Sequence, residues 1–160
     1  NKLSKLEESV EKILKLATQL GQTYIITNAE GGWVEYSSQL YIPKVYNVLS
    51  KLKIISARET YEKIYPGNPN EWKNQAFALT GEKLDESTIT NIVVLGDSKI
   101  EMEAGVNLSK MYSTARIKTA KFRESPSPNE LNNQLKLVLA KFEEIVSSLK
   151  NWTIRLEKQV

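Results

Sequence analysis

The sequence predicts an α/β fold with a Rossmann-like, three-layer parallel sheet. Short runs rich in β-branched and aromatic residues, typical of buried strands, recur at Thr23–Thr27, Lys53–Ser56 and Asn91–Leu95. Segments with helical periodicity separate these runs. Strands that alternate with helices form parallel sheets joined by right-handed crossovers. In such sheets the functional residues lie just past the carboxyl ends of the strands.

The segments that surround the first strand predict helices. Apolar residues recur at steps of three and four over Leu3–Leu20, which is one helix face, and Gly21 is a natural stop. A second helical pattern runs from Trp33 to about Leu49, and Pro43 starts a new helix or bends this one. Further along, the pattern predicts a short helix near Thr60–Tyr65, a helix over Pro69–Leu79, a helix over Ile100–Lys110 and a fourth strand over Thr114–Phe122.

The end of the chain shows the most regular periodicity. Apolar residues alternate steps of four and three at Leu131, Leu135, Val138, Phe142, Ile145, Leu149, Trp152 and Leu156. A helix of this length would span about 45 Å, whereas a small domain spans only about 30 Å. We therefore expect an α/β domain over residues 1–148 and a distal helical segment over 149–160 that extends beyond it. Leu149, Trp152 and Leu156 would then dock a protein partner; the alternative is that Leu131–Ile145 covers the sheet and the rest frays.

The composition excludes several kinds of chemistry. The chain has no cysteine and no histidine, which removes disulfides, zinc–thiolate sites, Ser–His triads and imidazole bases. Any metal must be a hard cation held by oxygen, so Mg²⁺ is the leading candidate. The net charge of +3 gives no reason to expect nucleic acid or membrane binding. There is no secretory signal and no apolar run long enough to span a membrane, so we expect a cytoplasmic protein.

The loop after the third strand is the first candidate site. Gly96 allows a sharp turn, Asp97 stands at the strand tip, and Glu101 follows one helical turn later. Two carboxylates at this spacing can face one cation, directly or through water. The alternative is that Asp97 or Ser98 is only a helix cap and that Glu101 is a solvated surface acid.

Two further features suit a phosphate group. Thr27 ends the first strand, and its hydroxyl together with the backbone N–H groups of Asn28 and Ala29 would cradle phosphate oxygens. Lys73 lies on a predicted helix and would neutralise a phosphoryl group. The alternatives are an ordinary strand-end turn at Thr27 and a solvated helix lysine at Lys73.

Together these features resemble the haloacid-dehalogenase-like (HAD) phosphohydrolase superfamily. Thr27 matches its second motif, Lys73 its third, and Gly96-Asp97 with Glu101 its fourth. The blocks YIITNAEGGWVE, IISARETYE, YPGNPNEWKNQAF, LGDSKIEMEA and KTAKFRESPSPNEL are similar to a subgroup of HAD-like proteins in protists and related eukaryotes. The resemblance implies a Mg²⁺-dependent phosphatase that hydrolyses phosphomonoesters through an aspartyl phosphate.

One part of the family pattern is missing. The resemblance implies a nucleophile in a DxDxT motif at the end of a central first strand, but the only aspartates are Asp85 and Asp97. Asp85 lies in a polar loop and cannot take this place. We therefore expect the 160 residues to begin downstream of the nucleophile and to be inactive as they stand. The absent strand would leave unpaired edges on Thr23–Thr27 and Asn91–Leu95, and an upstream segment would supply it.

Three functional readings follow. The first is a phosphatase whose nucleophile lies upstream; its site would lack a large cap and suit a phosphoprotein substrate. The second is an inactive HAD-like domain that serves as a structural or interaction subunit of a larger assembly. The third and weakest is a receiver-like phosphoacceptor. Arg58 and Glu59 would line the same pocket or form a surface ion pair, and Trp33 and Trp72 are expected to stiffen the site by packing.

Overall fold

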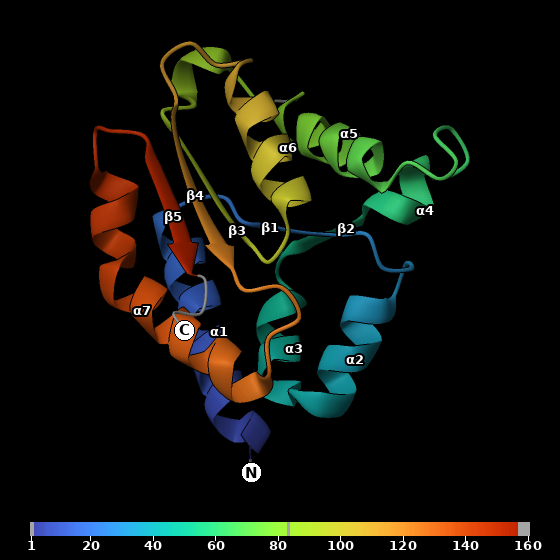
Figure 1. Ribbon diagram of the computed structural model, residues 1–160, viewed down its shortest axis with the longest axis vertical. Coiled ribbons are helices and arrows are strands. Elements are labelled where there is room, and N and C mark those ends of the chain that lie inside the picture. The colour runs from blue at the N-terminus through green and yellow to red at the C-terminus, as the bar shows by residue number, and fades with distance from the viewer. Residues whose placement is uncertain (1, 83, 157–160) are drawn as a thin grey trace.

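The structure is a computed structural model that describes residues 2–82 and 84–156 (Figure 1). The described part of the chain is α/β, and its five strands fall into two parallel groups. Strand β1 pairs with β2, and β3, β4 and β5 form a second sheet in that order. The predicted class, α/β with parallel strands, is therefore confirmed.

Most predicted elements of the first half are present with small shifts in their ends. They are α1 (Lys2–Leu20), β1 (Tyr24–Thr27), α2 (Trp33–Tyr41), α3 (Pro43–Leu49), β2 (Lys53–Ser56), α4 (Ala57–Tyr61) and α5 (Pro69–Gly81). Pro43 starts a new helix, in which its missing N–H costs nothing. Helix α4 begins earlier than predicted because the hydroxyl of Ser56 caps it by accepting from the N–H of Glu59.

The second half builds the larger sheet. Its elements are the 3₁₀ turn η1 (Glu86–Thr88), β3 (Asn91–Gly96), α6 (Lys99–Ser109), β4 (Arg116–Phe122), α7 (Pro128–Ser147) and β5 (Trp152–Leu156). Ser127 caps α7 by accepting from the N–H of Glu130, and a proline stands at the first position of this helix.

The predicted long carboxyl-terminal helix is wrong. Helix α7 ends at Ser147, and residues 152–156 form β5 beside β4 rather than a helical extension. There is therefore no helix face shared by Leu149, Trp152 and Leu156. Neither predicted arrangement describes these residues: they form no helical stripe that docks a partner, and their segment does not fray. Leu149 is 84% exposed in the turn, whereas Leu156 packs on the core. Residues 157–160 lie outside the described part.

The reason is a competing period in the sequence. Trp152, Ile154 and Leu156 alternate with polar residues, and their burial alternates in the same way. This period of two suits a half-buried strand, although the spacing of the larger apolar residues also continues the helical pattern. Pairing with the free edge of β4 decides between the two.

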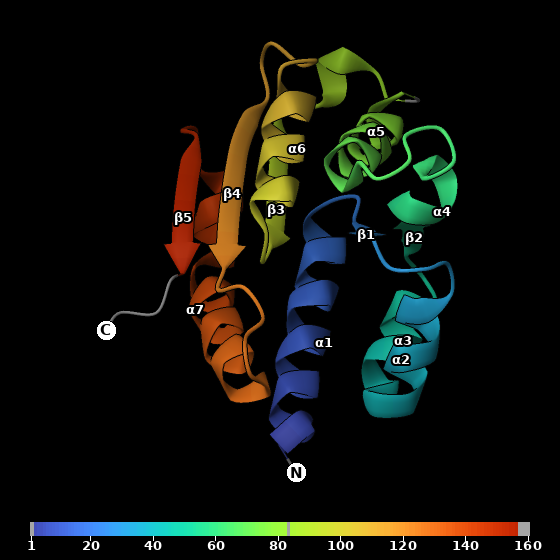
Figure 2. The same cartoon turned by 45° about the vertical axis from the view of Figure 1, so that its right-hand side comes forward.

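Helices cover both faces of the larger sheet. Val93 and Leu95 pack with α1 and α7 in one cluster, whereas Ile92 and Val94 pack with α6 in another. Figure 2 shows α6 and α7 on opposite sides of β3, β4 and β5. A buried hydrogen bond of 2.5 Å from the Ser9 hydroxyl to Oδ1 of Asn132 links α1 to α7. The β3–β5 half thus has three layers.

The two sheets do not join. No described residue pairs with the second edge of β1 or of β3, and Figure 1 shows β1 and β2 running across the direction of β3, β4 and β5. The expectation that the edges of Thr23–Thr27 and Asn91–Leu95 stay unpaired is confirmed for the described chain.

Candidate functional site

A buried ion pair forms the centre of the candidate site. The ammonium of Lys73, on α5, lies 2.8 Å from Oε1 of Glu101, on α6. Lys73 is only 5% exposed, so the alternative of a solvated helix lysine is wrong. A buried charge of this kind needs a partner, and Glu101 supplies it. Glu101 is therefore not a solvated surface acid either.

Glu101 is held from a second side by the start of its own helix. Its Oε2 accepts from the backbone N–H of Ser98 at 3.0 Å, and the Ser98 hydroxyl caps the helix in return. This reciprocal arrangement is a capping box. A Cβ atom at Gly96 would lie 2.7 Å from the same Oε2, so this close approach requires glycine.

The end of β1 is a closed turn. The Thr27 hydroxyl accepts from the N–H of Ala29 at 3.0 Å, so this N–H is already used and is not the free phosphate donor that was predicted. Asn28 donates from Nδ2 to the carbonyl of Pro69 at 3.2 Å, which ties the turn to the start of α5. Oδ1 of Asn28 is buried and has no hydrogen-bond partner in the described chain.

Ser56 and Glu59 hold the neighbouring strand end against this turn. Ser56 lies opposite Thr27 in the strand register and donates to the carbonyl of Ala29 at 2.6 Å. Glu59 lies so close to Gly31 that a Cβ there would be 2.1 Å from its carboxylate. Glu59 and Thr27 line one small hollow, but neither Lys73 nor Asp97 lines it, so Glu59 shares a pocket with only part of the predicted site.

Arg58 takes no part in that hollow. Its Nε lies 2.7 Å from Oε2 of Glu62, and both side chains are 44% exposed. The ion-pair alternative is therefore correct for Arg58, with Glu62 rather than Glu59 as the partner.

Asp97 is the most exposed of the predicted phosphate and metal ligands. It is exposed at the end of β3, and no group of three or more acidic side chains in the described chain is placed to hold a metal. Mg²⁺ needs about six oxygen ligands, and both carboxylate oxygens of Glu101 are engaged. The described residues alone therefore do not form a complete Mg²⁺ site.

The two tryptophans differ. Trp72 is buried and donates to the carbonyl of Tyr65 at 2.6 Å, so its predicted packing role is confirmed. Trp33 is 52% exposed and contacts only Tyr36 among the described rings, so the packing prediction is wrong for it.

The structure thus joins some predicted residues and leaves others apart. Lys73 meets Glu101, and Asn28 meets the start of α5, but no hydrogen bond links Thr27 to Asp97 within the described chain. No role was predicted for the Ser56 side chain, although a serine that follows a strand and precedes a helix is a recognisable cap signal.

Comparison with known proteins adds no assignment. No protein-family model matches the chain, and no curated protein matches it. Within the described residues no helix is long and apolar enough to cross a membrane.

Proposed function

We propose that these residues are the phosphate-holding part of a HAD-like, Mg²⁺-dependent phosphatase whose nucleophilic aspartate is carried on a strand outside the 160 residues. The observation that carries the proposal is the buried Lys73–Glu101 pair beside the acidic strand end at Gly96-Asp97. A charged lysine is seldom buried without a reason, and buried ionisable pairs next to strand ends favour a functional site.

Each residue has a definite task in this proposal. Lys73 would hold the phosphoryl oxygens and offset their charge, and Thr27 and Asn28 would donate to the same group from the end of β1. Glu101 keeps Lys73 in place until a substrate arrives. Asp97 would contribute one carboxylate to Mg²⁺, with the remaining protein ligands on the absent strand. When bound, the metal would shield the nucleophile from the negative phosphate.

The substrate class follows from access. The described connection between Ser56 and Lys73 contains only α4 and the start of α5, which is too short for a covering domain. An open site would accept a phosphorylated side chain on a folded protein, so we propose a phosphoprotein substrate.

The test uses the natural polypeptide that contains these residues. Hydrolysis of para-nitrophenyl phosphate with Mg²⁺ is measured for that polypeptide and for Lys73→Met and Asp97→Asn, with Lys12→Met as the control. Lys12 pairs with Glu8, and both side chains are more than half exposed. We expect each site variant to lose activity by about 10²-fold or more, and the control to keep it. Full activity of Lys73→Met in folded protein would refute the proposal.

The second candidate is a non-catalytic interaction subunit. Helix α2 presents four large side chains that are more than half exposed, namely Trp33, Tyr36, Leu40 and Tyr41. Exposed aromatic groups of this kind favour a protein contact. Two results together would favour this candidate. The folded polypeptide would hydrolyse no phosphomonoester, and Tyr36→Ser would abolish binding of a protein partner.

A further inference from the structure

Helix α2 lies at the outer edge of the molecule. It packs on α3, which packs on α1 in turn, and Figure 2 shows α2 and α3 on the opposite side of α1 from β3, β4 and β5. Ser38 is the one buried residue of α2. In the described chain no residue of this helix belongs to a buried apolar cluster. The large side chains of α2 therefore do not build the core.

The exposed side chains of α2 lie along one face. Trp33, Tyr36 and Leu40 follow one another at steps of three and four, and Tyr41 comes one position later. At 3.6 residues per turn these positions fall within an arc of about 140°. The rings of Trp33 and Tyr36 lie side by side, with their centroids 6.0 Å apart. These four residues, the α2 face, form a contiguous apolar surface, which is typical of a protein contact.

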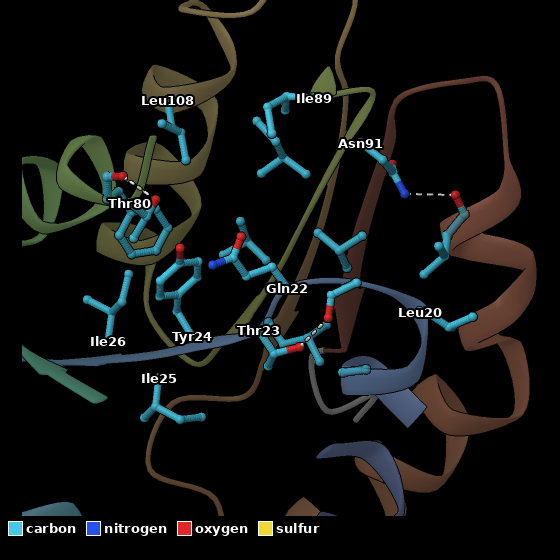
Figure 3. Close-up of a pocket in the computed structure, with 18 of the residues that line it drawn as sticks. Leu20, Gln22, Thr23, Tyr24, Ile25, Ile26, Thr80, Ile89, Asn91 and Leu108 are labelled. Atoms are coloured by element: carbon cyan, nitrogen blue, oxygen red, sulfur yellow. Dashed lines mark hydrogen bonds between the residues drawn. The ribbon is translucent and has the colours of Figure 1, made fainter. Parts of the chain in front are cut away.

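The α2 face is separate from the apolar space inside the molecule. That space is a cavity of about 440 Å³ between the two sheets, and side chains such as Tyr24, Ile26 and Leu108 line it (Figure 3). No residue of α2 is among those that line it in the described chain. The α2 face therefore meets a partner on the outside of the fold and not through this cavity.

Three carboxylates lie at the amino end of the α2 face. Glu30 precedes the helix, Glu35 lies in its first turn, and Glu59 reaches from α4 to Gly31. The three line one small hollow, and no lysine or arginine lines it with them. Within residues 2–82 and 84–156 none of the three forms an ion pair, and α2 itself carries no basic residue. One end of the α2 face thus carries negative charge without a compensating cation.

The backbone of α2 decides the shape of partner that fits. Its N–H and C=O groups are used inside the helix, so the α2 face offers no row of hydrogen-bonding partners to an extended peptide. A second helix satisfies its own backbone groups and needs only apolar side chains that pack between those of α2. A helix with an apolar stripe at steps of three and four therefore suits this surface.

The charge decides how such a helix lies. Lysine and arginine are most favourable in the last turn of a helix, because they offset the negative end of its dipole. A helix antiparallel to α2 brings its last turn beside Glu30, Glu35 and Glu59. We infer that the α2 face binds an amphipathic helix of a protein partner, antiparallel to α2, with lysine or arginine in its last turn. This partner rests on the second candidate function, in which α2 is a protein contact, and not on phosphatase chemistry.

The test measures binding of synthetic peptides to the natural polypeptide that contains these residues. The probe is a fluorescently labelled helical peptide of about 18 residues, with leucine at steps of three and four and lysines in its last turn. One matched peptide has the lysines in its first turn, and another has glutamates in their place. Side-chain staples keep all three helical. By fluorescence anisotropy at low salt, we expect the probe to bind at least ~10-fold more tightly than either matched peptide.

Variants of the protein locate the contact. Tyr36→Ser should weaken binding of the probe by about 10-fold or more, whereas Leu137→Ser, at an exposed position on α7, should leave it unchanged. The double variant Glu30→Gln/Glu59→Gln should weaken binding about 3-fold or more at low salt and reduce its salt dependence. Glu143→Gln, also exposed on α7, should do neither. Circular dichroism checks that each variant is folded.

Three results would overturn the inference. The first is equal binding of the lysine and glutamate peptides, and the second is undiminished binding of the probe by Tyr36→Ser. The third is a dimer in sedimentation that Tyr36→Ser dissociates, since the α2 face would then hold a second copy of the chain. Tighter binding of the peptide with lysines in its first turn would refute the antiparallel arrangement.

The same preparations separate this inference from both candidate functions. Equal binding of the lysine and glutamate peptides that Tyr36→Ser abolishes would keep α2 as a protein contact and refute only the basic helix. Hydrolysis of para-nitrophenyl phosphate by wild type, measured beside the peptide titration, tests the phosphatase alone. Hydrolysis that Tyr36→Ser leaves unchanged, together with lost peptide binding, would support the basic helix as a partner distinct from the phosphatase site.

Discussion

Lys73 and Glu101 come from different helices and meet at 2.8 Å, in an environment that leaves their side chains only 6% and 13% exposed. The contact joins α5, which follows the smaller sheet, to α6, which covers the larger one. It is therefore a link between the two halves of the molecule as well as the centre of the candidate site.

Breaking this pair from one side should cost much more than removing it completely. We expect Lys73→Met to lower the free energy of unfolding by about 3 kcal/mol, because it leaves the Glu101 carboxylate buried without its cation. The double variant Lys73→Met/Glu101→Gln should recover a large part of this loss. Urea unfolding measures both. Lys12→Met, at an exposed pair, should change little.

The fit of Gly96 against Glu101 predicts a second effect on stability. Gly96→Ala places a methyl group within 2.7 Å of the Glu101 carboxylate, which the capping box and Lys73 hold in place. We expect a loss of about 1–3 kcal/mol in thermal or urea unfolding. Gly21→Ala is the matched control, since its new Cβ meets nothing within 4 Å. An equal effect of both substitutions would contradict the close fit.

Lys118 predicts a dependence of stability on pH. It is 1% exposed on β4, where its ammonium donates to Asn91 and to the carbonyl of Val146 and faces no carboxylate that pairs with it in the described chain. Burial lowers the pKa of Lys118 from its ordinary value of 10.5, and the nearby Arg116 lowers it further.

The direction of the effect follows from proton binding. Between the lowered pKa and 10.5 the unfolded chain binds more protons than the folded chain, so the contribution of Lys118 to stability rises with pH. We expect the free energy of unfolding of wild type, measured in urea, to rise relative to that of Lys118→Met as the pH increases from neutral. The free energy of unfolding of the control variant Lys121→Met, on the same strand, should change with pH in the same way as that of wild type. A difference that shrinks with rising pH would show the opposite shift.

The assignment of β5 can be tested with two apolar residues. Ile154 packs against the core cluster beside α7, whereas Leu149 is 84% exposed. We expect Ile154→Ala to cost about 1–2 kcal/mol and Leu149→Ala to cost less than about 0.5 kcal/mol. Urea unfolding distinguishes this from a helical docking stripe through Leu149, Trp152 and Leu156, for which both truncations would leave stability unchanged.

Local signals were sufficient for most elements of the fold. Cap and stop residues marked the start of α3 at Pro43 and the end of α1 near Gly21, because these residues act on their own backbone. Buried strands were recognisable as short β-branched runs, and β2 has the predicted bounds. The failure at Trp152 has an equally local cause, since its segment satisfies two periods at once.

The candidate site was predictable only in part. The order of Thr27, Lys73 and Asp97 along the chain predicted the members of the site, and the structure shows that Lys73 is buried. The chain order carried no information on what Glu101 would contact. Its carboxylate is divided between Lys73 and the Ser98 N–H, an arrangement that depends on how α5 packs against α6.

The sequence by itself determined the α/β class, the bounds of β2 and the start of a new helix at Pro43, since periodicity and capping act over a few residues. Only the tertiary structure decided that residues 152–156 are a strand, that Lys73 is buried against Glu101, and that the two sheets enclose an apolar cavity. The physical reason is range: pairing of a free strand edge and burial of a charge depend on partners tens of residues away, which no local pattern encodes.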